Sequence, residues 1–471
     1  MKDEDRIMNG KKIRRLLALL MTSAVIMSSA GCAGGSANGT GSEQTGVTGG
    51  EFSSTNDGEH AIEADGEEKS YSGVKVTKTG DSSAGDEADF YGDNAAVFAT
   101  NKATLTLENM TIDTNGKHAN AVFSYGSGTT VEIIGSQITT SGDCSGGLMT
   151  TGGGTMIAKN LTISTTGNSS AAIRSDRGGG TVKVEEGTYT TSGKGSPVIY
   201  STADITVSEA NLTSTSSEGI VVEGRNSVTL NNVTLTADNN TNNSDKSSVH
   251  KAVMIYQSMS GDAAQGAATF TMTDGSLTNK TGDVFFVNNT TATITLSNAV
   301  IINEDENGVL LRAEAAGWGK EGSNGGKVNL YLNAQEVEGD IVVDKVSGVN
   351  LYLGTDSVYG GAVNAANGGD VYVAIESGSQ WVLTGNSYVK GLSCEAGGVD
   401  LNGYTLYVDG VPYTAGTSSS GTAIVFSSGS DDSGDGVPGE PPSGEKPDGS
   451  HEPPPGGRPE GTPPPKPGEN T

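Results

Sequence analysis

The chain is poor in aromatic residues and in positive charge, and each shortage argues against a class of protein. Aromatic residues make up only 5% of the 471 residues, whereas 70 are glycine, so a conventional globular domain with an aromatic-rich core is not expected. Lysine and arginine number 28 against 56 acidic residues, a formal net charge of −28. This acid excess opposes binding to nucleic acid or anionic lipid through a basic face. Divalent cations, cationic surfaces and neutral glycans remain compatible partners.

Histidine is also scarce, and its positions do not suggest a catalytic or metal-binding pattern. The four histidines are His60, His118, His250 and His451. Because they fall in separate segments that would share no face of a repeat, neither a Ser-His-Asp arrangement nor a histidine-rich metal site is expected. No Walker loop is present, and the glycine runs at 152–154 and 178–180 do not open helices. These runs are expected at corners and not around phosphates.

Cysteine occurs three times and predicts no disulfide. Cys32 follows an export signal, which leaves Cys144 and Cys394 in an early and a late repeat. About nine repeat steps of roughly 4.8 Å would separate them by roughly 40 Å. A disulfide needs Cα atoms within about 7 Å. Both are therefore expected to be free thiols.

The N-terminus carries the features of an export signal. A basic start at residues 11–15 precedes a short apolar stretch, residues 16–27, which is too short to span a bilayer as a mature helix. The sequence Ser29-Ala-Gly-Cys32 then resembles a bacterial lipobox, with Ser29 where that pattern usually carries an aliphatic residue. The resemblance implies a signal peptide over 1–31, lipidation of Cys32 and anchoring at the extracellular face of the bacterial cell membrane. Ordinary signal cleavage nearby is the alternative.

From about residue 95 to 311 the chain repeats one phrase, an apolar run, a polar turn, an alternating strand and then Asn, Gly or Asp. Examples are 105–112 (LTLENMTI), 228–235 (VTLNNVTL) and 294–301 (ITLSNAVI). Alignment of the phrases puts these residues in one column: Asn109, Gly135, Asn160, Glu186, Glu209, Asn232, Asp274 and Asn298. The period of about 23–26 residues, broken by one insertion, is typical of a solenoid. Most of these residues tolerate the left-handed backbone of a sharp corner.

Three short strands per repeat and no helical periodicity predict an all-β fold, a right-handed single-stranded parallel β-helix over residues 71–415. Here the chain resembles the pectate-lyase-like superfamily and the adhesin-like β-helical lipoproteins of Gram-positive bacteria. Residues 32–70 are rich in Gly, Ser and acidic residues and predict a disordered tether. Residues 428–471 form an acidic, Pro- and Gly-rich tail that is also expected to be disordered.

Two neighbouring columns of the first strand are both apolar. One contains Phe123, Met149, Ile173, Ile199, Val221, Met254, Phe285 and Leu310; the other contains the residue before each. Only one of two adjacent columns of a flat strand points inward. Either the chain bends so that both are buried, or one forms an exposed apolar stripe for interaction or self-association. Burial at a bend is the favoured interpretation.

Two long loops, 257–268 and 312–327, leave the repeats at the same corner and supply the first group of candidate binding residues. Trp318 lies between two glycines, and it either stacks on a sugar ring or packs back over the repeat. The residues expected to border the same region are Tyr256, Gln257, Arg312 and Glu314.

A second group comes from the family resemblance. Pectate-lyase-like enzymes hold Ca²⁺ with acidic residues and use an Arg or Lys base, which implies Arg174, Asp176 and Arg177 as candidates, with Tyr200 one repeat further on. No tight acidic cluster is visible, so Ca²⁺ is a possible cofactor without an assigned site. No catalytic residue is assigned.

The leading hypothesis is a surface-anchored binding or adhesion protein that recognises polysaccharide. The combination of an anchor, a long repeat and no catalytic cluster favours it. The alternatives are a pectate-lyase-like polysaccharide-degrading enzyme and a purely structural surface rod.

Overall fold

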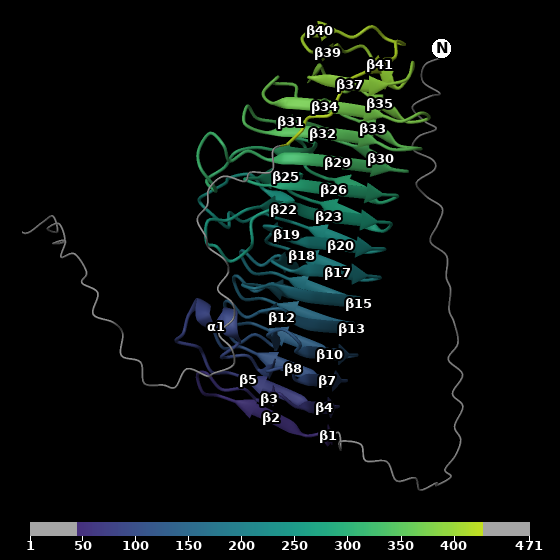
Figure 1. Ribbon diagram of the computed structural model, residues 1–471. Helices are drawn as coiled ribbons and strands as arrows, with labels where there is room; N and C mark the ends of the chain where they lie inside the picture. Colours follow the sequence, from purple (N-terminus) through teal and green to yellow (C-terminus); the bar gives the residue numbers. More distant parts are fainter. Residues whose placement is uncertain (1–44, 427–471) are drawn as a thin grey trace, which may run out of the picture. The chain divides into compact units, whose positions relative to one another are not determined.

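The computed structural model describes residues 45–426, which form an all-β unit of short, mostly parallel strands (Figure 1). Strands from successive repeats pair in parallel, so that equivalent strands lie one above another in three stacks. The first two stacks belong to a 23-stranded sheet and the third is an 11-stranded sheet. These long parallel sheets confirm the all-β prediction and are compatible with a parallel β-helix or solenoid.

The first stack contains the alternating strands that precede the Asn/Gly corner. Its members are β1 (Thr45–Thr48), β4 (Glu68–Ser72), β7 (Thr104–Glu108), β10 (Thr130–Ile134), β13 (Gly154–Thr165), β15 (Gly180–Thr191), β17 (Asp204–Ser208), β20 (Ser227–Asn231), β23 (Ala268–Thr273), β26 (Thr291–Ser297), β29 (Lys327–Asn333), β32 (Gly348–Leu353), β34 (Asp370–Ile375) and β37 (Gly391–Cys394).

The second stack follows the corner, and the long strands β13 and β15 run through the corner into it. Its other members are β2 (Glu51–Ser54), β5 (Lys75–Lys78), β8 (Thr111–Thr114), β11 (Gln137–Thr140), β18 (Asn211–Ser214), β21 (Thr234–Ala237), β24 (Ser276–Asn279) and β27 (Val300–Asn303). A separate four-stranded sheet contains β30 (Glu336–Glu338), β33 (Val358–Gly360), β35 (Gln380–Val382) and β38 (Val399–Asp400).

The third stack carries the candidate site. It consists of β3 (Ile62–Asp65), β6 (Val97–Thr100), β9 (Val122–Tyr125), β12 (Leu148–Thr151), β14 (Ile173–Ser175), β16 (Ile199–Ser201), β19 (Ile220–Glu223), β22 (Lys251–Tyr256), β25 (Asp283–Asn288), β28 (Val309–Ala313) and β31 (Asp340–Val343). Among the described residues, antiparallel pairing occurs only near the C-terminal end. There β39 (Leu406–Val408) pairs with β40 (Val411–Pro412) and also, in parallel, with β36 (Ser387–Val389), while β41 (Ser419–Ser420) pairs with β37.

The corner between the first two stacks confirms the predicted column. All eight aligned residues, from Asn109 to Asn298, have φ between 51° and 61°. The backbone N–H of each of several column members donates to the next repeat, for example from Asn109 to the carbonyl oxygen of Ile134 at 2.9 Å. Two column pairs also join through side chains, Asn232 to Glu209 and Asn298 to Asp274, each at 2.6 Å. These contacts are Asn–carboxylate pairs, so the corner is not a ladder of amides alone.

The core lies between the stacks, and the two adjacent apolar columns of the third stack are both buried, as predicted, but segments packed on the outer face bury the second column, and not the bend that the sequence suggested. The alignment of these two columns that the sequence predicted is wrong by one residue in some of the repeats. Leu148 pairs with Ile173, and Met149 pairs with Arg174. The inner column packs into the main core, whereas the outer column faces the other side of the sheet. This outer column positions the site.

The predicted boundary at residue 71 is wrong. Strands β1 to β3 and the start of β4 lie within the predicted tether, and β1 pairs in parallel with β4. Their short polar strands follow the same repeat as the later ones, with too few apolar residues to stand out from a solvated segment. The signal peptide, Cys32 and the tail 428–471 lie outside the described residues.

Cys144 and Cys394 are free thiols, as predicted. In the described part of the chain, no helix has the length and apolar character needed to cross a membrane.

Candidate functional site

The outer column of the third stack changes character along its length. Parallel register aligns Phe98, Phe123, Met149, Arg174, Tyr200, Val221, Met254, Phe286 and Arg312. The column is therefore apolar, then polar for the two repeats that contribute Arg174 and Tyr200, and then apolar again. A buried apolar side chain on this outward face needs a cover, because nothing in the sheet itself shields it from water.

Two different segments cover the apolar parts. The helix α1 (Asp86–Tyr91) and the residues after it cover the first part, where Ala95 packs with Phe98, Phe123 and Met149. Figure 1 shows α1 beside the stack, and the Thr151 hydroxyl of β12 donates to the carbonyl oxygen of Phe90 at 2.6 Å.

Loops cover the second part of the column, where Val221, Met254 and Phe286 pack with partly buried residues from residues 238–250 and 314–326. The polar part of the column remains between the two covers.

A pocket of about 330 Å³ opens in this interval. Its lining residues are Asp86, Asp89, Phe90, Cys144, Ser169, Ala171, Arg174, Asp176, Gly195, Pro197, Tyr200 and Asp262. Four of the charged side chains are carboxylates and one is arginine, so the lining is net negative. The floor is built on paired strands, which hold its side chains more firmly than loops would.

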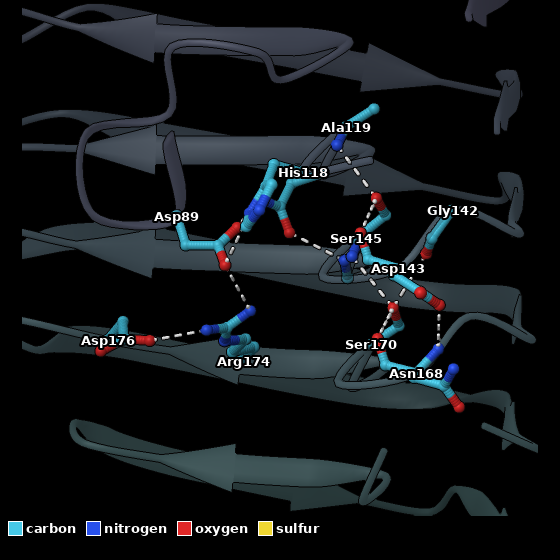
Figure 2. Close-up of polar contacts among 12 residues, drawn as sticks. Asp89, His118, Ala119, Gly142, Asp143, Ser145, Asn168, Ser170, Arg174 and Asp176 are labelled. Atoms are coloured by element: carbon cyan, nitrogen blue, oxygen red, sulfur yellow. Dashed lines mark hydrogen bonds and ion pairs between the residues drawn. The ribbon is translucent and has the colours of Figure 1, made fainter. Parts of the chain in front are cut away.

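Arg174 is the centre of a buried ion network (Figure 2). Its Nη2 lies 2.8 Å from Asp176 Oδ2, and its Nη1 lies 3.3 Å from Asp89 Oδ2. The side chain of Arg174 is 15% exposed, and those of Asp89 and Asp176 are 4% and 8% exposed. Asn120 also donates to Asp89 at 3.1 Å. The network ties α1 to the sheet.

The two carboxyl groups of this network respond differently to their surroundings. Burial would raise the pKa of Asp89, but Arg174, His118 and Asn120 outweigh burial and hold that pKa below its ordinary value. For Asp176, burial outweighs the charge of Arg174 and raises the pKa. Burial opposes the charge on Arg174, but the two carboxylates outweigh burial and raise the pKa of its guanidinium further. Arg174 is therefore permanently protonated, with Nη1 and Nη2 each paired with a carboxylate.

A second polar cluster lies behind the pocket. The buried carboxyl group of Glu223 accepts hydrogen bonds from the hydroxyls of Tyr200 and Tyr256, the latter at 3.0 Å. Burial raises the pKa of Glu223 in spite of these hydrogen bonds and one from Ser258. Burial also raises the pKa of both tyrosines well above its ordinary value. Glu223 does not line the pocket, but its hydrogen bond from the Tyr200 hydroxyl holds that lining side chain in place.

Arg177 bridges two lining residues of the pocket, Asp262 and Phe90. Its Nη2 and Nε both bind Oδ1 of Asp262, at 2.8 and 3.1 Å, and its guanidinium carbon lies 3.9 Å from the centre of the Phe90 ring. This contact links α1 with the loop at 257–267. Arg177 is 46% exposed, so the link itself is worth little in free energy.

The structure brings together four of the nine predicted binding residues, Arg174, Asp176, Tyr200 and Tyr256, and places Arg177 at their edge. The other four do not line the pocket, although Trp318 and Gln257 lie beside Tyr256.

Arg312 pairs with Asp283 at 2.5 Å and with Glu314 at 3.2 Å. Gln257 is buried in its own loop, where it donates to Ala263. Trp318 packs edge-on against Tyr256, with ring centroids 5.2 Å apart, as the packing alternative predicted.

A second left-handed corner, not predicted from the sequence, precedes the third stack. His118, Cys144, Ser169 and Gly195 occupy equivalent positions, with φ between 54° and 64°. The signal was the repeated Gly-x-x-Ser at 142–145, 167–170 and 193–196.

Each serine of this motif donates to a glycine carbonyl of the preceding repeat, for example Ser145 to Gly116 at 2.7 Å. It also accepts from the backbone of that repeat, as Ser145 does from Ala119 at 2.9 Å (Figure 2). Alignment on this motif gives the correct pairing of Met149 with Arg174.

The same corner places His118 and Cys144 beside Asp89. Ligand-type atoms of these three side chains all lie within 4.8 Å of one another. His118 Nδ1 lies 3.2 Å from Asp89 Oδ2 but makes no hydrogen bond. Burial and Asp89 raise the pKa of the Cys144 thiol, while Arg174 and Lys117 oppose them. The sequence-based exclusion covered only Ser-His-Asp arrangements and histidine-rich metal sites, and it did not foresee one histidine, His118, beside a carboxylate and a thiol.

No protein-family model, curated protein or solved structure matches this chain. The resemblance to the pectate-lyase-like superfamily stays a prediction, and the function has to be argued from the site itself.

Proposed function

We propose that this chain is a cell-surface-anchored binding protein that recognises polysaccharide, and that its described residues form a right-handed parallel β-helix. The observation that supports binding is the pocket between the two covers, with Arg174, Asp176 and Tyr200 as its polar floor. The 23–26-residue period, of roughly three strands per repeat, supports the β-helix. The lipobox-like sequence ending at Cys32 supports the anchor at the extracellular face of the membrane.

The chemistry of the pocket suits a polyhydroxylated ligand. Its volume falls within the range of roughly 300–1,000 Å³ that is common for small-molecule sites. Arginine and carboxylate groups that already hold one another in place can donate to and accept from sugar hydroxyls without reorganising. The net negative lining disfavours uronic acids and other anionic sugars. We therefore expect a neutral or amino-sugar unit in the pocket.

The enzymatic alternative has less support from this geometry. A lyase of the pectate type needs an arginine or lysine that can give up its charge and act as a base. Arg174 is held protonated by two carboxylates. The substrate of such an enzyme is also anionic, which the lining opposes. A purely structural rod would bind no glycan and would have no use for a polar pocket.

Two matched variants test glycan binding. Asp176→Asn removes a charged acceptor that lines the pocket, and Asp283→Asn makes the same change in the ion pair of Arg312, which is in the same outer column. Hydrogen bonds to charged groups contribute about 1.5–3 kcal/mol. On a panel of neutral, amino and acidic polysaccharides, we expect Asp176→Asn to weaken binding about tenfold or more.

The control variant, Asp283→Asn, is expected to bind as the native chain does. Circular dichroism on both variants checks that each is folded. Failure of the native chain to bind any glycan of the panel, or equal losses in the two variants, would refute the proposal.

A further inference from the structure

Three metal-ligating side chains converge at the edge of the pocket from three separate elements. Asp89 comes from α1, His118 from the corner after β8 and Cys144 from the equivalent corner after β11. The side chains of Asp89 and His118 are 4% and 3% exposed, and Cys144 is half-buried and lines the pocket. An ion in the pocket would therefore reach Cys144 directly.

The arrangement of the three groups favours convergence on one point over a catalytic relay. In a Cys-His-Asp relay the imidazole separates the sulfur from the carboxylate, because each binds a different ring nitrogen. Here the ligand-type atoms of all three lie within 4.8 Å of one another, which makes a triangle. A triangle leaves one centre within reach of all three side chains.

The distances fit a tetrahedral ion with little adjustment. In a tetrahedron with bonds of about 2.0–2.1 Å, neighbouring nitrogen and oxygen ligands lie about 3.3–3.4 Å apart. His118 Nδ1 and Asp89 Oδ2 are 3.2 Å apart. The longest separation has to close by about 1 Å, which Cys144 can achieve by rotating its side chain.

An independent observation comes from the hydrogen bonding of His118. Its Nδ1 is buried and has no hydrogen-bond partner, although Asp89 Oδ2 is within hydrogen-bond distance. Buried nitrogens of this kind are nearly always bonded. The two atoms are 3.2 Å apart, close to the separation of two neighbouring ligands of one ion.

We propose that Asp89, His118 and Cys144 bind a divalent transition-metal ion of the zinc type, with a water molecule from the pocket as the fourth ligand. Thiolate and imidazole donors select zinc over Ca²⁺, which prefers oxygen ligands only.

Binding transfers the thiol proton of Cys144 to solvent, and the sulfur then bonds to the ion. The charges of Asp89, Asp176 and Arg174 sum to minus one. The 2+ charge of the ion and the single negative charge of the thiolate bring the site to neutrality. Because binding releases the thiol proton, the metal affinity rises with pH.

Cobalt(II) provides a direct test on the full-length chain after treatment with a chelator. We expect one Co²⁺ per chain, visible d–d bands of a tetrahedral ion and a thiolate-to-cobalt charge-transfer band, all abolished by added Zn²⁺. Cys144→Ser is expected to lose the charge-transfer band and to weaken zinc binding by more than the roughly 10–100-fold that loss of a ligand's hydrogen-bonding partner typically costs. This variant is expected to fold, because Ser169 occupies the equivalent corner in the next repeat.

Matched controls and a second ligand variant make the outcome decisive. Cys394→Ser and Cys32→Ser keep the charge-transfer band if the site is correct. His118→Gln, with its fold checked by circular dichroism, keeps the sulfur but loses the tetrahedral spectrum. Absence of a charge-transfer band in the native chain, or its persistence in Cys144→Ser, would overturn the proposal. Zinc titration does not involve glycan, so this result is separate from the test of polysaccharide binding.

Discussion

Replacement of Arg174 by methionine is expected to destabilise the repeat stack severely. Methionine keeps much of the apolar stem but removes the charge that neutralises Asp89 and Asp176. These carboxyl groups are 4% and 8% exposed, so water cannot replace the guanidinium. Removal of one partner from a buried ion pair costs about 3–5 kcal/mol. Asp89 keeps its hydrogen bond from Asn120, so a loss near the middle of that range is expected.

The assay is equilibrium unfolding in urea, with an arginine of the same outer column as control. Arg312 also binds two carboxylates, but only Asp283 is well buried, at 5%, whereas Glu314 is 34% exposed. Arg312→Met should therefore cost about half as much, roughly 2 kcal/mol.

A second substitution tests the mechanism of the loss. In an Arg174→Met background, Asp176→Asn should recover part of the lost stability, because it removes the uncompensated charge.

The pH dependence of the stability difference between the native chain and Arg174→Met provides a further test. The pKa of Asp89 in the folded chain is below its ordinary value of 3.8, so its contribution is complete above that pH and is lost as the pH falls through the folded pKa. The pKa of Asp176 is raised above 3.8, so Asp176 takes up its proton at higher pH than Asp89 does. The difference in stability between the native chain and Arg174→Met should therefore begin to shrink above about pH 4 and be smallest once both carboxyl groups are protonated. A variant within 1 kcal/mol of the native chain at pH 7, or a difference independent of pH, would refute the assignment of a buried network.

Three other predictions concern packing and charge. Gly142→Ala would place Cβ 2.0 Å from a backbone oxygen of the preceding repeat, so it should lower the free energy of unfolding by about 3 kcal/mol. The control Gly73→Ala, in open space at φ +64°, should lower it by only about 1 kcal/mol. Equal urea midpoints for the two variants would contradict the close stacking of the repeats. Burial raises the pKa of Glu223 above 4.5, so Glu223→Gln should be more stable than the native chain at pH 7. In urea titrations at several pH values, this difference in stability should disappear below about pH 4.5. A difference that does not change with pH would contradict the burial of a charged Glu223. Trp318→Ala should lower stability by about 1–2 kcal/mol through its lost contact with Tyr256 yet leave glycan binding intact; weaker binding would restore the sugar-stacking alternative.

Much of the repeat was readable from local chemistry. Asn109 and its equivalents indicate a left-handed corner, because few residues adopt positive φ without strain. The alternation of apolar residues in 105–107 or 228–230 predicts a strand with one buried face. Both features depend on a residue and its immediate neighbours. The corner column and the strand types were therefore predicted before the register was known.

The site could be predicted only in part. Arg174, Asp176 and Tyr200 were candidates because charged residues interrupt an apolar strand pattern. Asp89 was missed, since it lies in a helix 85 residues from its partner Arg174. Nothing in its local sequence shows that contact. The role of Trp318 was left open between two alternatives, and its ring packs on Tyr256.

The sequence by itself determined the period, the corners and the strand types of this protein, because each follows from the preferences of a few adjacent residues. Only the tertiary structure decided which outward side chains are covered and which line the pocket. That depends on where α1 and the loops pack, and their contacts join residues far apart along the chain. The convergence of Asp89, His118 and Cys144 is of this kind, since it requires two successive repeats and a separate helix to meet at one point.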